Sequence, residues 1–326
     1  MQAGASARFN QERIVLAIAA GMFIVFAVVL KGFLTPGNIV SLVQNVSILG
    51  VLGVGMALTI IGRGIDLSMV ANMAISVAWV LYLANHGTPL PVAVLLGLGL
   101  SLAIGLLNGI LIAYVEIPAI FATLAMGTAV YGLGQSVLVD SDVIFVPRTE
   151  VWFKAIGGAT IWGIPSPVIW LAVIGSAAAA FLAFTRPGRF IFGMGDNPQA
   201  ARVTGVPARP MMVLQYLASS LIAFSAGIIT ATLVDSMNTR MAASTLVYDV
   251  ILVVVIGGVG LSGGKGSVRN VVVGTLLIGI LLNGMTIMDV PYTFQNIVKS
   301  LILLVAIVTD SILNPRDEQT SQQGDI

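Results

Sequence analysis

The 326-residue sequence contains no cysteine and a single histidine, His86. It therefore cannot form disulfides or a thiolate nucleophile, and it lacks the ligands for a histidine-based metal site. Charge is also scarce, since only 9% of the residues are Asp, Glu, Lys or Arg, against roughly 25% in an ordinary soluble domain. With a net charge of +1, the chain has no overall basic field that would attract nucleic acid. We expect no metal site, no catalytic centre and no nucleic-acid partner.

Apolar residues, by contrast, make up 57% of the chain. A membrane-spanning helix needs about 20 predominantly apolar residues. Divided at Gly, Pro and Asn, the sequence predicts an all-α, polytopic transmembrane helical bundle of about ten spans. The predicted spans cover residues 14–33, 39–61, 68–85, 91–114, 117–138, 167–184, 211–233, 244–259, 270–288 and 291–312. They form one transmembrane domain, 14–312, between terminal tails at 1–13 and 313–326. We interpret the first apolar run as a retained span, since it has no clear small-residue cleavage site.

The distribution of Lys and Arg predicts the orientation of these spans, because cytoplasmic loops are enriched in both. The loop at about 185–210 carries four arginines and one acid, Asp196, whereas the loop at about 139–166 mixes acids with bases. We therefore predict that the first loop is cytoplasmic and the second external. Ten spans then place both termini in the cytoplasm. Lys31 falls on the external side, where its long side chain can snorkel to the interface.

A glycine-rich segment, "IGGVGLSGGKGS" at 256–267, raises the possibility of a phosphate-binding P-loop. That motif needs a glycine five positions before its Gly-Lys pair and a Ser or Thr after the lysine. Here the first position is Val259 and the second is Gly266. The segment fails at both places, so we expect it not to bind a nucleotide.

The stretch "GDNPQAARVTG" at 195–205 has signals for both ends of a short surface helix. Asn197 is a favourable N-cap, Pro198 suits the first helical position, and Gly205 can adopt the left-handed conformation that ends a helix. Two interpretations remain open. The segment is either an ordinary connecting loop or a docking element for a cytoplasmic partner.

Several polar residues fall within or beside the apolar runs. Asp66, in "GRGIDLS" at 62–68, either pairs with Arg63 or lines a solute pathway, because an acid at membrane depth needs a partner or a wet cavity. Asp249 and Lys299 either belong to a pathway or are structural, as an ion pair or as side chains that snorkel to an interface. Four amide side chains either bind a hydroxylated solute or join helices. These are Asn108, Gln135, Asn283 and Gln295.

Five segments together resemble a known family. They are, in order, "GMALTIIGRGIDLS", "IPAIFATLAMG", "GRFIFGMGDNPQAARVTGV", "VVVIGGVGLSGGKGS" and "NIVKSLILLVAIVTD". The combination resembles the sugar-specific permeases of bacterial ATP-binding-cassette importers, in the ribose-type branch, from about Asn38 to Asp310. The resemblance implies an inner-membrane permease of about ten helices, surrounded by membrane lipid, that translocates a sugar or related polyol.

The resemblance also implies the partners of the chain. They are a cytoplasmic ATPase, which binds the ATP and Mg²⁺, a periplasmic sugar-binding protein, and a second permease, either another copy or a related paralogue. No cofactor is then expected on this chain, and no ATP hydrolysis. In such permeases the segment matching 195–205 is the coupling helix that docks on the ATPase. The implied docking residues are Gly195, Asp196, Asn197, Ala200, Ala201 and Gly205. The pathway candidates are Asp66, Ser68, Asn108, Gln135, Asn283 and Gln295.

The sequence departs from the family pattern at a few positions. Ser68 is followed by "MVA" where relatives commonly have "VGS", Tyr131 replaces a frequent arginine, and Val247 replaces a glutamate. These differences leave the identity of the solute undetermined.

Three other classes of protein share parts of this pattern. An ion-coupled secondary transporter would use Asp66, Asp249 and Lys299 as a relay and would need no ATPase. A branched-chain amino acid permease shares the broad pattern, but is not expected to combine "GIDLS" with "GGKG". "GMGD" at 193–196 and "YD" at 248–249 are the signatures of intramembrane aspartyl proteases, but they occur here in reversed order, and the first lies in an arginine-rich loop.

Overall fold

A computed structural model describes residues 3–148 and 150–313 of the chain. In that part, eight helices are long and apolar enough to span a membrane. They are α1 (Ala3–Val29), α2 (Pro36–Ile61), α4 (Leu90–Ala113), α5 (Ala119–Leu133, continued by the π-helical turn Gly134–Leu138), α7 (Ser166–Phe184), α10 (Ala208–Leu233), α12 (Val268–Ile287) and α13 (Tyr292–Leu313). With the shorter apolar helices α3 (Met69–Asn85) and α11 (Leu246–Gly257), they correspond to the ten predicted spans. The prediction of an all-α polytopic bundle is confirmed.

The predicted tails are only partly described. α1 begins at Ala3, so most of the predicted N-terminal tail, 1–13, is helical. The predicted C-terminal tail lies outside the described residues from position 314 onward.

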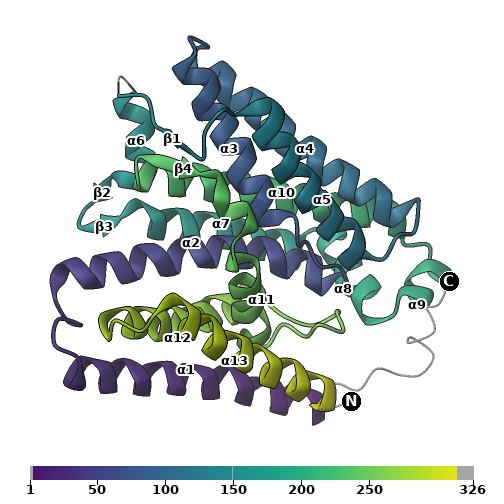
Figure 1. Ribbon diagram of the computed structural model, residues 1–326. Helices are drawn as coiled ribbons and strands as arrows, with labels where there is room; N and C mark the ends of the chain where they lie inside the picture. Colours follow the sequence, from purple (N-terminus) through teal and green to yellow (C-terminus); the bar gives the residue numbers. More distant parts are fainter. Residues whose placement is uncertain (1–2, 149, 314–326) are drawn as a thin grey trace.

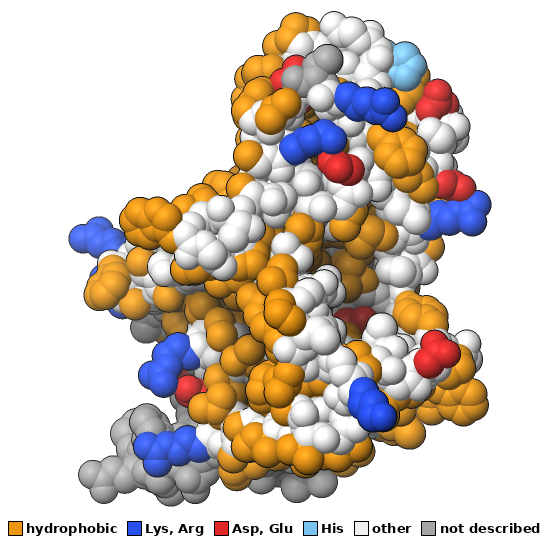
Figure 2. Space-filling model, turned by 90° about the vertical axis from the view of Figure 1, so that its left-hand side faces the viewer, with side chains coloured by type: hydrophobic (Ala, Val, Ile, Leu, Met, Phe, Trp, Pro, Cys, Tyr) orange, Lys and Arg blue, Asp and Glu red, His pale blue; other side chains and the backbone are white. Residues whose placement is uncertain are grey.

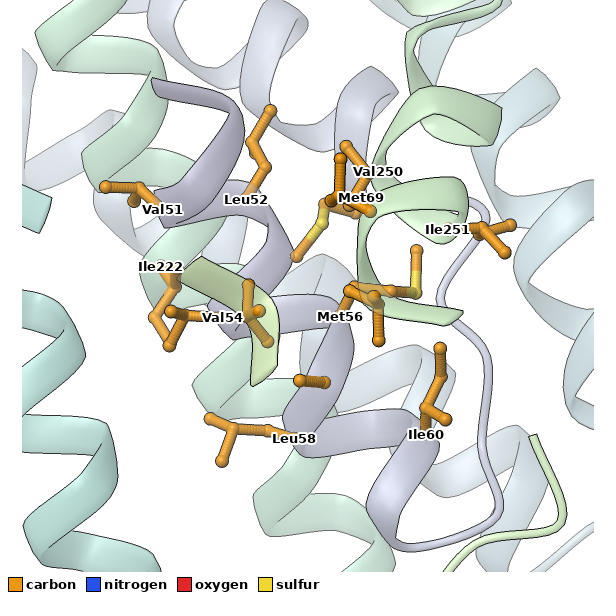
Figure 3. Packing of buried hydrophobic residues seen from close by; sticks show 14 of the residues in the cluster. Val51, Leu52, Val54, Met56, Leu58, Ile60, Met69, Ile222, Val250 and Ile251 are labelled. Atoms are coloured by element: carbon orange, nitrogen blue, oxygen red, sulfur yellow. The ribbon is translucent and has the colours of Figure 1, made fainter. Parts of the chain in front are cut away.

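Helix α2 lies at the centre of the bundle (Figure 1), with α1, α12 and α13 on one side and α3, α4 and α10 on the other. Every residue of α2 from Leu49 to Ile61 is buried. A helix that is apolar all round must be enclosed by other helices. Figure 3 shows Val54 and Met56 of α2 in one buried cluster with Met69, Ile222 and Val250 of neighbouring helices.

The connections gather at the two ends of the bundle. At one end lie the small helix α6 (Val151–Gly158) and two short antiparallel strand pairs, which the sequence did not predict. The strands are β1 (Val143–Phe145) with β4 (Ser236–Asn238), and β2 (Thr160–Ile161) with β3 (Ile164–Pro165). At the other end lie α8 (Arg186–Asp196) and α9 (Pro198–Val203). We call these ends the α6 side and the α8 side.

Helix α11 is too short to cross a membrane alone. Its 12 residues extend about 18 Å, against about 30 Å of hydrocarbon. The chain reaches α11 from β4 through a 3₁₀ helix, Thr239–Ala243, which packs against α3. Ala242 of this segment contacts the buried cluster that includes Ala71 and Ile75. Non-helical backbone therefore enters the bundle before α11 begins.

Candidate coupling site and solute pathway

The segment at 195–205 forms the predicted short helix. The Oδ1 of Asn197 accepts a hydrogen bond from the Ala200 N–H at 2.9 Å, which caps the first turn of α9. Pro198 is the first residue of α9, and Gly205 has a φ of +83° just beyond its end. The sequence signals for this helix are confirmed.

A second helix, α8, precedes it and was not predicted. The Oγ1 of Thr185 accepts a hydrogen bond from the Gly188 N–H at 3.1 Å, and Pro187 lies in the first turn. Thr followed closely by Pro is a helix-start signal that was present in the sequence. The segment between α7 and α10 therefore consists of two helices that meet at Asn197.

The six predicted docking residues differ in exposure. Gly195 and Ala201 are buried, and Ala201 packs with Met194 and Ala208. A buried residue cannot present a surface to a partner, so we assign these two to packing within the chain. The other four are exposed: Asp196, Asn197, Ala200 and Gly205. Val203, which is 88% exposed on α9, was missed, although an apolar residue in a polar loop was a visible signal.

Arg63 connects three loops on the α8 side. Its Nε donates at 2.8 Å to the carbonyl oxygens of Gly195 and Ser262, and one Nη donates to the Asp196 carbonyl at 3.4 Å. Asp66 is not among these partners, so of the two interpretations left open for Asp66, the local ion pair with Arg63 is excluded. The arginine instead links the α2–α3 loop, the end of α8 and the glycine-rich segment.

The glycine-rich segment is folded against this junction. Gly264 donates its N–H to the carbonyl oxygen of Ile61 at 2.8 Å. A Cβ on Gly195 would overlap both groups, so only glycine permits this approach. Gly263 and Gly264 have positive φ angles, which glycine adopts without steric cost. The abundance of glycine at 256–267 therefore has a structural explanation.

Three of the predicted pathway residues form one buried network. The carboxylate of Asp66 accepts hydrogen bonds from the Ser68 hydroxyl at 2.6 Å and from the Ser219 hydroxyl at 2.7 Å. The Nδ2 of Asn108 donates to the Ser68 hydroxyl at 2.7 Å. Buried polar groups that satisfy one another across helices act as specific contacts in a membrane protein. The network joins the α2–α3 loop to α4 and α10.

The other three lie apart from it. Gln135 donates to the Thr239 hydroxyl, and Gln295 donates to the Val290 carbonyl at 2.9 Å. Asn283 forms a reciprocal amide pair with Asn38, at 2.8 and 3.0 Å, which joins α12 to α2. The structure therefore does not gather the six candidates at one place, and their role in a pathway stays a prediction.

Asp249 and Lys299 form the ion pair that the sequence left open. The Lys299 Nζ lies 2.8 Å from the Asp249 Oδ2, and both side chains are about nine-tenths buried. The pair joins α11 to α13 in a groove of about 300 Å³.

Comparisons with known proteins agree with this architecture. Residues 38–307 match the family described as branched-chain amino acid transport system / permease component. The ribose import permease protein RbsC of Escherichia coli (strain K12) is 32% identical over 283 residues, which cover 86% of this chain and 87% of that protein. The corresponding protein of Bacillus subtilis (strain 168) is 33% identical over 290 residues, 89% of each chain.

A third relative carries a different sugar in its name. The galactofuranose transporter permease protein YtfT of Escherichia coli (strain K12) is 34% identical over 278 residues, which cover 84% of this chain and 80% of that protein. The family match begins in α2 and ends in α13, so it covers nine of the ten apolar helices wholly or in large part. The chain therefore belongs to this permease family, in the ribose-type branch of the permeases of ATP-binding-cassette importers.

Proposed function

We propose that this chain is the membrane-spanning subunit of an ATP-driven importer that translocates a sugar or related polyol. The observation that carries the proposal is its similarity, across more than four-fifths of both chains, to permeases named for ribose import. A relative from Azospirillum brasilense, 31% identical, is named for L-arabinose. The solutes in these names are all monosaccharides, which favours a sugar over an amino acid for this chain.

The energy for transport would come from a separate ATPase subunit, which holds ATP and Mg²⁺ and docks on α8 and α9. The exposed residues of α9 support this role, because they form a projecting surface at one end of the bundle. A displacement of α8 would reach α2 through the contact of Gly195 with Ile61, and would reach the glycine-rich segment through Arg63. Arg63 directly follows the end of α2, and the glycine-rich segment follows the end of α11.

The α8 side would face the cytoplasm and the α6 side the periplasm. The excess of arginine between α7 and α10 supports this orientation. Ten spans would then keep both termini in the cytoplasm of a bacterial inner membrane. Figure 2 shows the α6 side as a hollowed face with Lys, Arg, Asp and Glu side chains on its upper part and along its left and lower margins. A periplasmic sugar-binding protein would dock here.

A second permease, either another copy or a related paralogue, would complete the pathway. Helix α13 supports this part of the proposal. Only 6% of the residues in its apolar stretch are buried within the chain, and its sequence mixes polar and apolar residues. Polar side chains on an outer helix favour protein or water as neighbours over lipid.

The test is to purify the chain from its native membrane in mild detergent, identify co-purifying proteins by mass spectrometry, and assay ATP hydrolysis on the same sample. We expect an ATPase and a sugar-binding protein, whose bound sugar names the solute. Purification alone, with no hydrolysis but with gradient-driven uptake in vesicles, would instead support the ion-coupled secondary transporter.

A further inference from the structure

The groove between α11 and α13 combines polar and apolar residues in the membrane-spanning part of the bundle. Thr245, Asn296 and Ser300 provide hydroxyl and amide groups, and the Asp249–Lys299 pair provides charge. The full lining is Thr245, Tyr248, Asp249, Leu252, Asn296, Lys299, Ser300, Leu303, Leu304 and Ile307. None of these residues belongs to the coupling site or to the Asp66 network.

The polar groups of the groove are arranged in a row. The Thr245 hydroxyl lies 2.8 Å from the Tyr292 hydroxyl and donates to the Asn296 Oδ1 at 3.2 Å. One turn further along α13, Lys299 meets Asp249 and also lies 5.5 Å from the centre of the Tyr292 ring. Residues three or four apart share one face of a helix, so the row is a continuous strip.

The part of α13 beside the strip is apolar. Ile297 and Leu301 are 50% and 57% exposed, and both are apolar. Those apolar side chains suit contact with lipid. A strip with a charged pair, an amide and hydroxyls is unfavourable beside lipid. Because two neighbouring parts of one helix differ in this way, the strip is adapted to an occupant other than lipid.

The start of α11 gives independent support. The segment Ser236–Thr245 enters the bundle without a continuous α-helix, and α11 begins beside the groove at Leu246. Irregular backbone at membrane depth is tolerated where it is enclosed by protein or borders a water-filled cavity. Broken helices of this kind surround solute sites in other transport proteins.

We propose that this groove is a carbohydrate-binding site on the transport route. This inference rests on the proposed function. The hydroxyl and amide groups of Thr245, Asn296 and Ser300 match the donors and acceptors of a sugar, and the half-exposed ring of Tyr248 offers an apolar surface for a pyranose or furanose face. The volume of about 300 Å³ is at the lower end of the range for small-molecule sites, as a monosaccharide requires.

The far end of the groove would act as the barrier to the sugar. Beyond Ser300 the lining changes to Leu303, Leu304 and Ile307, with no polar side chain among them. A hydroxyl-rich solute loses its hydrogen bonds along such an apolar lining, so it would stay at the polar strip until the helices move apart.

The natural absence of cysteine makes a direct test possible. Single variants Asn296→Cys and Ser300→Cys would be compared with Ile297→Cys and Leu301→Cys, which lie beside the strip on α13 and do not line the groove. Each complex, reconstituted with its ATPase, would be treated with a charged, membrane-impermeant methanethiosulfonate reagent. We expect the two strip cysteines to react roughly tenfold faster, because a thiolate forms only where water reaches the sulfur.

Protection by sugar completes the test. Labelling would be repeated with D-ribose, L-arabinose, D-galactose and ribitol, and uptake of each would be measured before labelling. We expect a compound that is taken up to slow labelling of Asn296→Cys and to leave Ile297→Cys unchanged. Equal labelling of all four cysteines, or strip labelling that no transported compound slows, would overturn the inference while leaving the importer intact. A wild-type complex that takes up neither these compounds nor the sugar bound by its co-purified binding protein would count against the proposed function instead, and equal labelling of the four cysteines would still overturn the inference.

Discussion

The Nε of Arg63 donates a hydrogen bond to the carbonyl oxygen of Gly195 at 2.8 Å, across 132 positions of sequence. The same Nε also contacts the carbonyl of Ser262 at 2.8 Å. Arg63 itself has a φ of +67°, an uncommon conformation for a residue with a side chain. The cost of that backbone is offset by bonds that hold the coupling element to two other loops.

Replacing Arg63 with glycine separates the strain of its backbone from the hydrogen bonds of its side chain. Glycine accepts the positive φ without strain, but it cannot make the bonds, each of which is worth about 1.5–3 kcal/mol when one partner is charged. We expect Arg63→Gly to lower uptake by about tenfold or more while ATP hydrolysis by the complex continues, because the ATPase would move α8 without moving the loops beyond it. Uptake and hydrolysis would be measured together in proteoliposomes. Arg269→Lys is the control, since Arg269 is 78% exposed in a surface pair with Glu12. Unchanged uptake in Arg63→Gly would refute the proposed linkage.

Gly195 and Gly193 offer a matched pair on α8. A methyl group at Gly195 would overlap the carbonyl of Ile61 and the backbone of Gly264, whereas at Gly193 it would meet nothing within 4 Å. We expect Gly195→Ala to destabilise the chain by about 1–3 kcal/mol through overpacking, with loss of uptake. Gly193→Ala should be neutral or slightly stabilising, because alanine favours a helix more than glycine does. Thermal unfolding in detergent would compare the two, and equal melting temperatures would contradict the close contact.

Val203 tests whether α9 is the docking surface. Because it is 88% exposed, an acidic side chain there has little effect on folding. We expect Val203→Asp to leave the melting temperature unchanged and to prevent co-purification of the ATPase. Val234→Asp, at a 58% exposed position on the α6 side, is the control and should retain the ATPase. Retention of the ATPase by Val203→Asp would place docking elsewhere.

Much of the bundle was predictable because membrane insertion depends on local composition. Each span is set by the length of an apolar run, and each boundary by Gly, Pro or Asn, so the ten segments follow from reading along the chain. The same holds for α9, whose cap and end depend on Asn197 and Gly205 alone. Helix α8 was missed because its apolar run is short, although Thr185 and Pro187 signal its start.

The interior of the site was not predictable in the same way. The hydrogen-bond acceptors of Arg63 are backbone carbonyls, which carry no residue-specific signal. For Asp66 the sequence left two interpretations open, a pair with Arg63 or a place on a solute pathway, and neither named its hydrogen-bond donors, Ser68 and the distant Ser219. Which partner a buried polar group takes depends on how helices pack, and a single sequence does not state that packing.

The Asp249–Lys299 pair allows stability and transport to be separated. Lys299→Met alone leaves a carboxylate without its partner at about nine-tenths burial, so we expect a loss of about 3–5 kcal/mol in folding stability. The double variant Asp249→Leu/Lys299→Met removes both charges. It should recover most of that stability, because two apolar groups of similar size are tolerated where one unpaired charge is not. Thermal unfolding of the three proteins in detergent would measure this recovery.

Uptake by the double variant then shows what the pair does. If the charges serve only to hold α11 against α13, a variant that folds as well as the wild type also transports as well. If they form part of a polar strip for a sugar, uptake stays low although folding and ATP hydrolysis are restored. We expect the second outcome, since the pair lies in the same groove as Thr245, Asn296 and Ser300. Full uptake by a well-folded double variant would reduce Asp249 and Lys299 to a structural contact.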